Sequence, residues 1–338
     1  MNTASSKWAN YLIITFMICL LLYYGGNIVM PFIFSVFISL LLLPVVNFLE
    51  RRKFPVWLSS LLAVLSLTTL ICGVGFFLYL EIDQMVKDLP ETVKSNTGAV
   101  QQASAWFADL NIAENIERFS TDIVTNSADY LQQIITYISS TVMMMVTIPV
   151  YVFFMLVYRD RAEAFIELKF AKNIDSAKSV AQSINQSVRN YISGLFFVIL
   201  TVGVLLSTGL YFLGIPYWLL LGILCALLTL LPYIGVVLGA LLPITIAVLT
   251  KDSLFYPVAV LGLFILVQFL EGNLITPKIV GNAVNINPVI LMLGLLIMGA
   301  LSGIMGLVLT IPILAVLRIL FNSSEELKPF GKLMANED

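Results

Sequence analysis

The 338-residue sequence is too apolar for a soluble protein, because 59% of its residues are hydrophobic, only 11% are charged and its mean hydropathy is +0.98. It has no histidine and its three cysteines stand singly in apolar runs, which disfavours zinc, haem and disulfide sites and leaves no metal or cofactor to expect. The net charge of -2 says little, since only the distribution of charge between loops informs on membrane topology.

Apolar runs of about 20 residues, the length that a helix needs to cross a bilayer core of roughly 30 Å, recur along the sequence. They are rich in Leu, Ile, Val and Phe and do not alternate in period two, which favours helices over a β-barrel. We therefore predict an all-α, polytopic integral membrane protein with about eight transmembrane helices. The expected segments are 8–24, 28–49, 56–80, 138–158, 190–213, 216–249, 254–275 and 288–320.

The first helix is expected to be retained, because Tyr23, Tyr24 and Gly25 stand where a signal peptide would carry a small-residue cleavage site. The sixth and eighth segments are too long for one straight crossing, and Gly and Pro interrupt both. Whether 216–249 crosses once or folds back as a hairpin stays open, and the choice reverses the orientation of everything after it.

Charge in the loops predicts the topology. Residues 81–137 carry nine acids and three bases, whereas 159–189 carries six bases and four acids and the loop at 50–53 adds three bases. By the positive-inside rule the two basic regions are cytoplasmic and 81–137 is outside, which fits a cytoplasmic N-terminus. Apolar residues recur at helical spacing in both long regions, so we expect a helical extracytoplasmic insert at 81–137. The cytoplasmic helix at 159–189 would lie on the membrane, on a neighbouring subunit or over this protein's own base.

Helix-breaking residues interrupt the sixth segment in the stretch TLLPYIGVVLGALLP, Thr229 to Pro243. Pro232 lacks an amide hydrogen and obstructs the carbonyl four residues back, while Gly235 and Gly239 permit close backbone approach. A helix broken in this way frees backbone groups that can bind an ion or a polar solute where they line a cavity. The alternative is a kinked packing helix with a face of small residues.

The stretch QFLEGNLITPK, Gln268 to Lys278, contains Glu271, the only acid between residues 253 and 324. Gln268 lies one turn before it, and Asn273 and Pro277 follow where the helix is loosened. One carboxylate and two amide side chains beside freed carbonyls are the ingredients of a cation or proton site. The alternative is structural, with Glu271 reaching the membrane interface or pairing with Lys278.

Two further patterns carry weaker signals. PYWLLLG at 216–222 and PVILMLG at 288–294 share a proline six residues before a glycine, as in the internal repeats of many transporters. The loop GNAVNINP, 281–288, could line a polar entrance, although connecting loops are commonly rich in asparagine. We find no Walker loop, no GxSxG motif and no basic aromatic stripe, which disfavours an enzyme or a nucleic-acid binder.

The order LLPYIGVVLGALLP, QFLEGNLITPKIVG and NPVILMLGLLIMGALSGIMGLVLTIPILAVL closely resembles the AI-2E family of bacterial membrane proteins, which are predicted permeases. The three motifs cover about 229–320, and the eight-segment layout extends the resemblance over nearly the whole chain. The family's motif positions carry over to Pro232, Tyr233, Gly235, Gln268, Glu271, Asn273, Pro277, Gly281, Pro288, Gly303, Gly306 and Pro312.

The resemblance implies an inner-membrane transporter with both termini in the cytoplasm that assembles as a homo-oligomer, with a pentamer as the working hypothesis. The family is named for proposed export of autoinducer-2, a small polar furanone derivative, and other members are described as sodium or lithium/proton antiporters. The label does not settle the solute, so a small polar solute, Na⁺ and H⁺ all remain candidate partners besides the lipid bilayer, and no nucleic acid is expected.

We accordingly expect 1–80 to hold helices 1–3, 138–158 helix 4 and 190–320 helices 5–8 as the transport core, with 321–338 as a cytoplasmic tail. Glu271 is the expected coupling carboxylate, Gln268 and Asn273 would hold the solute or ion, and the Gly and Pro positions would permit motion. A sodium(lithium)/proton antiporter is one alternative. A non-transporting membrane scaffold that uses 81–137 or 159–189 as its interaction surface is another.

Overall fold

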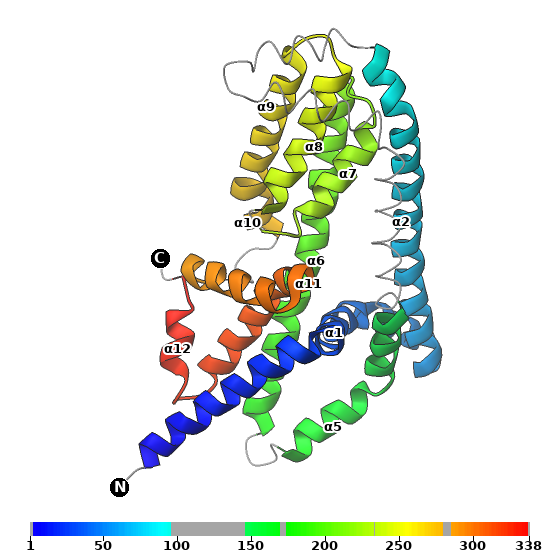
Figure 1. Ribbon diagram of the computed structural model, residues 1–338. Coiled ribbons are helices and arrows are strands. Elements are labelled where there is room, and N and C mark those ends of the chain that lie inside the picture. Colours follow the sequence, from blue (N-terminus) through cyan, green and yellow to red (C-terminus); the bar gives the residue numbers. More distant parts are fainter. Residues whose placement is uncertain (1–2, 96–145, 170–173, 233, 280–284, 337–338) are drawn as a thin grey trace. The chain divides into compact units, whose positions relative to one another are not determined.

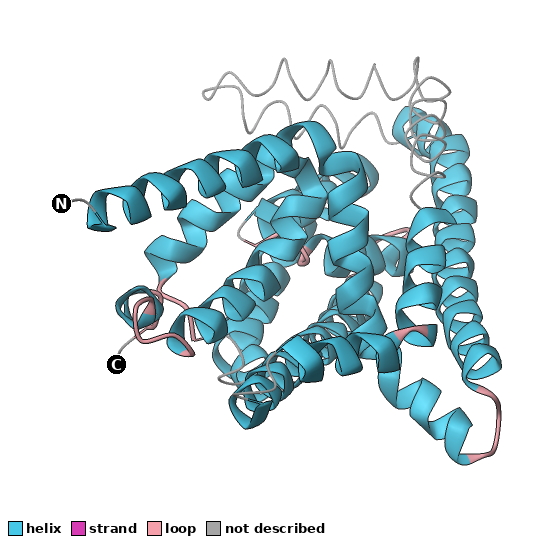
Figure 2. Ribbon diagram, turned by 90° about the horizontal axis from the view of Figure 1, so that it is seen from below, coloured by secondary structure: helices cyan, strands magenta, loops and turns pink. Residues whose placement is uncertain are grey.

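The computed structural model describes residues 3–95, 146–169, 174–232, 234–279 and 285–336. Within these ranges the chain forms helices joined by turns, without strands (Figure 2). Most of the expected insert at 81–137, together with Tyr233 and Gly281, lies outside the described residues. In chain order the helices are α1 (Thr3–Arg51), α2 (Val56–Ser95), the helix Val146–Val157, α5 (Arg159–Lys169), α6 (Ile174–Phe212), α7 (Trp218–Leu228), α8 (Ile234–Thr250), α9 (Phe255–Leu270), the π-helix η3 (Glu271–Ile275), α10 (Thr276–Ile279), α11 (Pro288–Asn322) and α12 (Lys328–Leu333).

The described part of the chain contains five helices that are long and apolar enough to cross a membrane. Three shorter apolar helices, Val146–Val157, α7 and α8, accompany them. These findings confirm an all-helical, polytopic membrane protein. The candidate spans are Ile28–Arg51, Val56–Glu91, Asp175–Phe212, Phe255–Ile279 and Pro288–Asn322.

Helix α1 joins the first two expected segments into one helix of 49 residues. At a rise of 1.5 Å per residue its contour measures about 74 Å, more than twice the thickness of a bilayer core. Gly25 and Gly26 do not interrupt it, because two helical glycines cost only about 1 kcal/mol each. Unpaired backbone groups in an apolar environment would cost several kcal/mol each, so continuing the helix is the cheaper solution.

The chain divides into two compact units, to both of which α2 and α6 contribute. Unit 1 comprises Met1–Ser66, Met144–Ser193 and Val280–Asp338, and unit 2 comprises Leu67–Met143 and Gly194–Ile279. The core of unit 1 joins Met30 and Phe37 of α1 to Val188 of α6 and Leu309 of α11, all of which are buried. This cluster is the contact through which α1 packs against α11.

Helix α11 is folded into two arms at Ser302 and Gly303. Gly303 has φ of 59° and ψ of -139°, a conformation available essentially only to glycine. A Cβ at Gly294 would lie 2.9 Å from Cδ1 of Leu314, a residue that a straight helix would place about 30 Å away. The two arms therefore run back along each other as a helical hairpin.

In unit 2, the expected sixth segment is likewise a hairpin of two helices, α7 and α8. The thiol of Cys225 in α7 donates to the carbonyl oxygen of Gly239 in α8 at 2.9 Å, although a straight helix would separate these residues by about 21 Å. Pro232 lies in the turn between the helices. The question that the sequence left open at 216–249 is thus answered in favour of two helices folded against each other.

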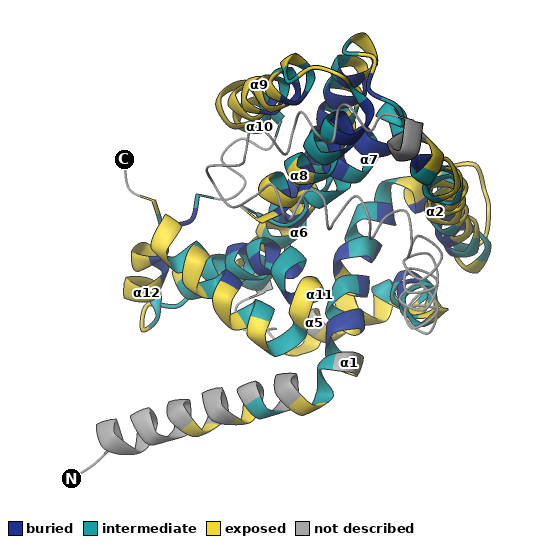
Figure 3. Ribbon diagram, turned by 45° about the horizontal axis from the view of Figure 1, so that its top comes forward, coloured by how far each residue is buried: buried dark blue, intermediate teal, exposed yellow. Residues whose placement is uncertain are grey.

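Helix α8 packs against α7 on one side and α9 on the other (Figure 1). Helix α9 buries Val260, Phe264 and Val267 against the unit and exposes other large apolar side chains, among them Ile265 and Phe269 (Figure 3). An apolar outer face of this kind is what a lipid-facing helix presents. The packing of α7, α8 and α9 positions the candidate site described next.

Candidate functional site

Glu271 lies where α9 changes into a π-helix. The α-helix ends at Leu270, and the residues Glu271–Ile275 form the wider π turn, in which the amide of Thr276 donates to the carbonyl oxygen of Glu271. Gly272 and Asn273 are weak α-helix formers, which favours a local departure from α geometry. Single π turns inside α-helices are rare and frequently occur at functional sites.

Two neutral donors hold the Glu271 carboxylate. The side-chain amide of Gln268 donates to Oε2 at 2.9 Å, and the hydroxyl of Thr276 donates to Oε1. Among the described residues no cation makes an ion pair with Glu271, so the pairing with Lys278 that sequence alone allowed does not occur. The carboxylate charge is therefore solvated by hydrogen bonds but has no counter-ion from the described chain.

Glu271 and Gln268 line a small cavity in unit 2, where Glu271 is half-buried and Gln268 is exposed. Its volume is about 20 Å³, which is room for one water molecule or one small bare cation. Four helices and the π turn contribute to its wall: α6, α7, α8, α9 and η3. The lining residues are Val202, Leu206, Cys225, Thr229, Val236, Gly239, Phe264, Val267, Gln268 and Glu271.

The opposite wall comes from the α7–α8 hairpin. Cys225 and Gly239 meet there, and Thr229, the residue that caps the end of α7, donates its hydroxyl to the carbonyl oxygen of Ala226 at 2.6 Å. Gly235, four residues before Gly239, is buried so closely against α7 that a Cβ would overlap the carbonyl oxygen of Leu228. The hairpin therefore lines this side of the cavity with Cys225, Thr229, Val236 and Gly239.

The structure thus brings together three of the predicted residues: Gln268, Glu271 and Gly239. Asn273 does not line the cavity, and its side-chain amide donates to the carbonyl oxygen of Phe269 at 2.9 Å. Pro277 lies exposed in α10. Pro232 and Gly235 lie in unit 2 but do not line the cavity. Pro288, the first residue of α11, and Gly303, Gly306 and Pro312 further along it lie in unit 1.

Sequence reasoning missed Cys225, Thr229 and Thr276. Cys225 and Thr229 precede Pro232 in the sixth segment. Had 216–249 been predicted as a hairpin, both residues would have been expected to face its second helix. No simple signal points to Thr276, because residues five apart stand about 140° apart on an α-helix. Only the π turn brings its hydroxyl to Glu271.

The sequence is similar to a family of transport proteins. The family sequence model described as AI-2E family transporter matches residues 12–326 of this chain. YrrI of Bacillus subtilis, provisionally named a transport protein, is 28% identical over 311 residues, which cover 87% of this chain and 86% of YrrI. The AI-2 transport protein TqsA of Escherichia coli is 24% identical over 301 residues, which cover 88% of this chain and 86% of TqsA. MT0215 of Mycobacterium tuberculosis, also provisionally named a transport protein, is 27% identical over 327 residues, which cover 93% of this chain and 88% of MT0215.

Proposed function

The chain belongs to the AI-2E family of transporters, and on that premise we propose that it moves a small polar solute across the bacterial inner membrane by way of the Glu271 cavity. Membrane transport itself follows from the family and from the apolar helices. The proposal concerns the solute, the route and the residues that act on it.

The observation that carries the proposal is the carboxylate of Glu271, held by Gln268 and Thr276 and without a counter-ion from the described chain. An ionisable group within apolar surroundings is costly and persists where it binds a proton, an ion or a substrate. Glu271 can accept hydrogen bonds from hydroxyl groups, and Gln268 can donate or accept them. These are the partners that a small hydroxylated molecule needs.

The name of TqsA supports an autoinducer-2-like solute for this chain. A cavity of about 20 Å³ is far smaller than the roughly 300–1,000 Å³ of ordinary ligand sites, so passage of an organic solute requires the cavity to open. The α7–α8 hairpin is the part that would move, because it forms one wall of the cavity and Pro232 interrupts the chain between its two helices. Gly303 provides a second bend in α11.

We further propose the topology that the loop charges predicted. In it the 50–53 loop, the 159–189 region and both termini lie in the cytoplasm and the 81–137 insert lies outside. The expected eight separate crossings are not kept, because α1 is one continuous helix and the sixth and eighth segments are hairpins. Copies assemble as a homo-oligomer, with a pentamer as the working hypothesis. The partial burial of Arg159 beside Glu50 supports the cytoplasmic assignment, since the pair joins the basic 50–53 loop to the basic 159–189 region.

A sodium(lithium)/proton antiporter is the second candidate, and the size of the cavity favours it. A volume of about 20 Å³ accommodates a bare cation or one water without any opening. A single carboxylate that exchanges a proton for Na⁺ would account for the lack of a counter-ion at Glu271.

One reconstitution separates the two candidates. Purified wild-type protein is placed in liposomes that contain either autoinducer-2 or a pH-sensitive dye, and empty liposomes serve as the control. We expect saturable loss of autoinducer-2 from protein-containing vesicles, and no proton movement when a sodium gradient alone is imposed.

The opposite pattern, sodium-driven proton movement with autoinducer-2 retained, would replace the first candidate by the antiporter. If neither the solute nor protons move in vesicles that hold correctly inserted protein, both candidate functions are wrong.

A further inference from the structure

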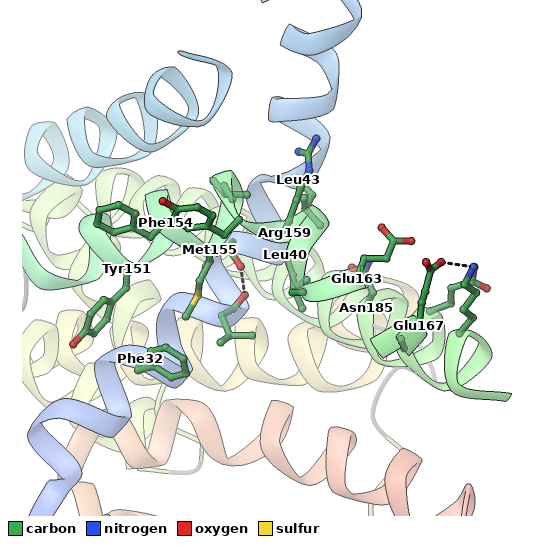
Figure 4. Close-up of a pocket in the computed structure, with 18 residues that line it drawn as sticks. Phe32, Leu40, Leu43, Tyr151, Phe154, Met155, Arg159, Glu163, Glu167 and Asn185 are labelled. Atoms are coloured by element: carbon green, nitrogen blue, oxygen red, sulfur yellow. Dashed lines mark hydrogen bonds and ion pairs between the residues drawn. The ribbon is translucent and has the colours of Figure 1, made fainter. Parts of the chain in front are cut away.

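A second cavity lies in unit 1, away from the proposed transport site and sharing no residue with it. Its volume is about 720 Å³, within the roughly 300–1,000 Å³ typical of ligand sites. It lies between α1, the helix Val146–Val157, α5 and the start of α6 (Figure 4). All of these segments belong to the same compact unit.

One end of this cavity is apolar. Phe32, Val36 and Leu40 of α1 line it together with Phe154 and Met155 of the helix Val146–Val157. Two aromatic rings of this wall are in contact: Phe32 packs edge to face against Tyr151, with ring centroids 5.8 Å apart. Phe32 and Phe154 are each about half exposed, at 51% and 50%, so this wall is open to an apolar occupant.

The other end is charged. Arg159, Glu163 and Glu167 of α5 and Lys178 of α6 line it, and the change from apolar to charged residues falls at Tyr158–Arg159. Tyrosine followed by basic residues is typical of the place where a helix leaves the hydrocarbon for the cytoplasmic headgroup region. The cavity therefore runs across a membrane interface, and its shape and polarity suit an amphiphile with one apolar and one charged end.

At that end of the cavity, some charged side chains form ion pairs and one does not. Nη2 of Arg159 pairs with Glu50 at 2.6 Å and Nζ of Lys178 pairs with Glu167 at 2.7 Å, so both cations already have partners. Glu163 makes no ion pair within the described part of the chain. The two cations and two carboxylates of the lining balance in charge, and Glu163 is the carboxylate among them that is left for an ammonium group to pair with.

Two polar atoms among the lining residues are buried without a hydrogen-bond partner in the described chain: Nη1 of Arg159 and Oδ1 of Asn185. A buried donor or acceptor left unpaired costs about 1–3 kcal/mol, so a ligand that satisfies it gains affinity. Nη1 can donate to a phosphate or ester oxygen. Oδ1 can accept from an ammonium or a hydroxyl group.

We propose that this cavity binds one phospholipid whose headgroup carries both a phosphate and an ammonium, as phosphatidylethanolamine does. Its acyl chain would lie against Phe32 and Phe154, its phosphate would approach Arg159, and its ammonium would face Glu163. Phosphatidylglycerol offers the same acyl chains and phosphate but no ammonium to pair with Glu163.

Lipid retention tests the proposal. Delipidated protein in detergent is incubated with equal amounts of phosphatidylethanolamine and phosphatidylglycerol of identical acyl chains, and bound lipids are counted by native mass spectrometry. Wild type should favour phosphatidylethanolamine by up to about fivefold, the effect of one exposed ion pair. Glu163→Gln should abolish that preference, whereas Glu325→Gln, an exposed acid outside the cavity, should keep it.

A steric pair of variants tests the location. Val36→Trp fills the apolar end, and Val45→Trp adds the same bulk at an equally exposed position of α1 that does not line the cavity. We expect only Val36→Trp to lose the bound lipid. Thermal unfolding of each variant verifies that the fold is retained.

Three results would overturn the proposal. Equal lipid retention by the two tryptophan variants would remove the cavity as the site, and equal or reversed lipid preference in wild type would remove the ammonium assignment. A change of oligomeric mass in Val36→Trp with lipid retention unchanged would show that a second copy of the chain covers this face.

Discussion

The side-chain amide of Gln268 donates to Oε2 of Glu271 at 2.9 Å, at the junction where α9 widens into the π turn. The pair stands one helical turn apart on the wall of a cavity that α6, α7 and α8 complete. A neutral donor stabilises the carboxylate without neutralising its charge. Glu271 therefore remains available to a proton, a cation or a solute hydroxyl.

Replacing Gln268 should slow transport more than replacing Asn273. Gln268→Met removes a donor to a charged oxygen, an interaction that contributes about 1.5–3 kcal/mol, so we expect roughly tenfold slower flux or more. Asn273→Ala removes an amide that does not line the cavity and donates to the backbone of its own helix. Initial solute efflux from matched proteoliposomes measures both, and equal effects of the two changes would contradict a specific role for Gln268.

The hairpin turn between α7 and α8 should not tolerate a Cβ at Gly235. The added carbon would overlap the carbonyl oxygen of Leu228, a backbone atom that cannot rotate away, so we expect Gly235→Ala to destabilise by about 1–3 kcal/mol or more. At Gly262 of α9 nothing lies within 4 Å of the added Cβ. Gly262→Ala should be neutral or stabilising by about 0.5–1 kcal/mol.

Thermal unfolding in one detergent compares these two alanine variants. Equal melting temperatures would show that the close approach of α7 and α8 at Gly235 does not hold the hairpin.

Arg159 contacts two carboxylates whose contributions should differ. Glu50 accepts two bonds from Nη2, at 2.8 and 2.6 Å, and its side chain is only 23% exposed, whereas Asp160 is 76% exposed and lies 3.4 Å from Nε. Glu50→Gln should cost about 1.5–3 kcal/mol because the guanidinium loses a charged, partly buried acceptor. Asp160→Asn should cost less than about 1 kcal/mol, as exposed pairs do. Denaturation at low and high salt checks the ranking, which the reverse order would refute.

Cys225 offers a native probe of the proposed route. Its side chain is 2% exposed and lines the same cavity as Glu271, so a small thiol reagent should label it slowly at rest and faster during transport. Saturating solute should protect it. The measurement uses a Cys19→Ser, Cys72→Ser background, with a protein that keeps only Cys72 as the control for general reactivity. If solute does not change the labelling rate of Cys225, just as it should not change that of Cys72, the solute does not pass through this cavity.

Much of the fold was accessible from sequence because the bilayer imposes it through segment length and composition. Apolar runs predicted the helices, and a solitary acid in an apolar run identified Glu271 as the residue to explain. The boundary between the expected segments 8–24 and 28–49 was wrong, since the energetic cost of Gly25 and Gly26 in a helix is smaller than the cost of exposing backbone to lipid. Helix α1 consequently runs through a position where separate segments were expected.

The partners of Glu271 could not be predicted in the same way. Cys225, Thr229 and Gly239 reach the cavity because α7 and α8 fold back on each other, which local sequence allowed but did not require. Thr276 reaches Glu271 through a π turn, a rare backbone geometry without a reliable sequence signature. Asn273 shows the converse, since α-helical reasoning placed it near the site and the structure bonds it to its own helix.

The central claim is that Glu271 acts directly in transport. Its most direct test compares wild type with Glu271→Gln in proteoliposomes of equal protein content, with Glu325→Gln as the control for loss of an exposed acid. Glutamine matches glutamate in size and can still pair with Gln268 and Thr276, so the fold should be preserved. We predict that Glu271→Gln reduces solute or coupled-ion flux to the level of empty vesicles while Glu325→Gln transports as wild type does. Flux by Glu271→Gln at the wild-type rate would contradict the account and leave the carboxylate with a structural role.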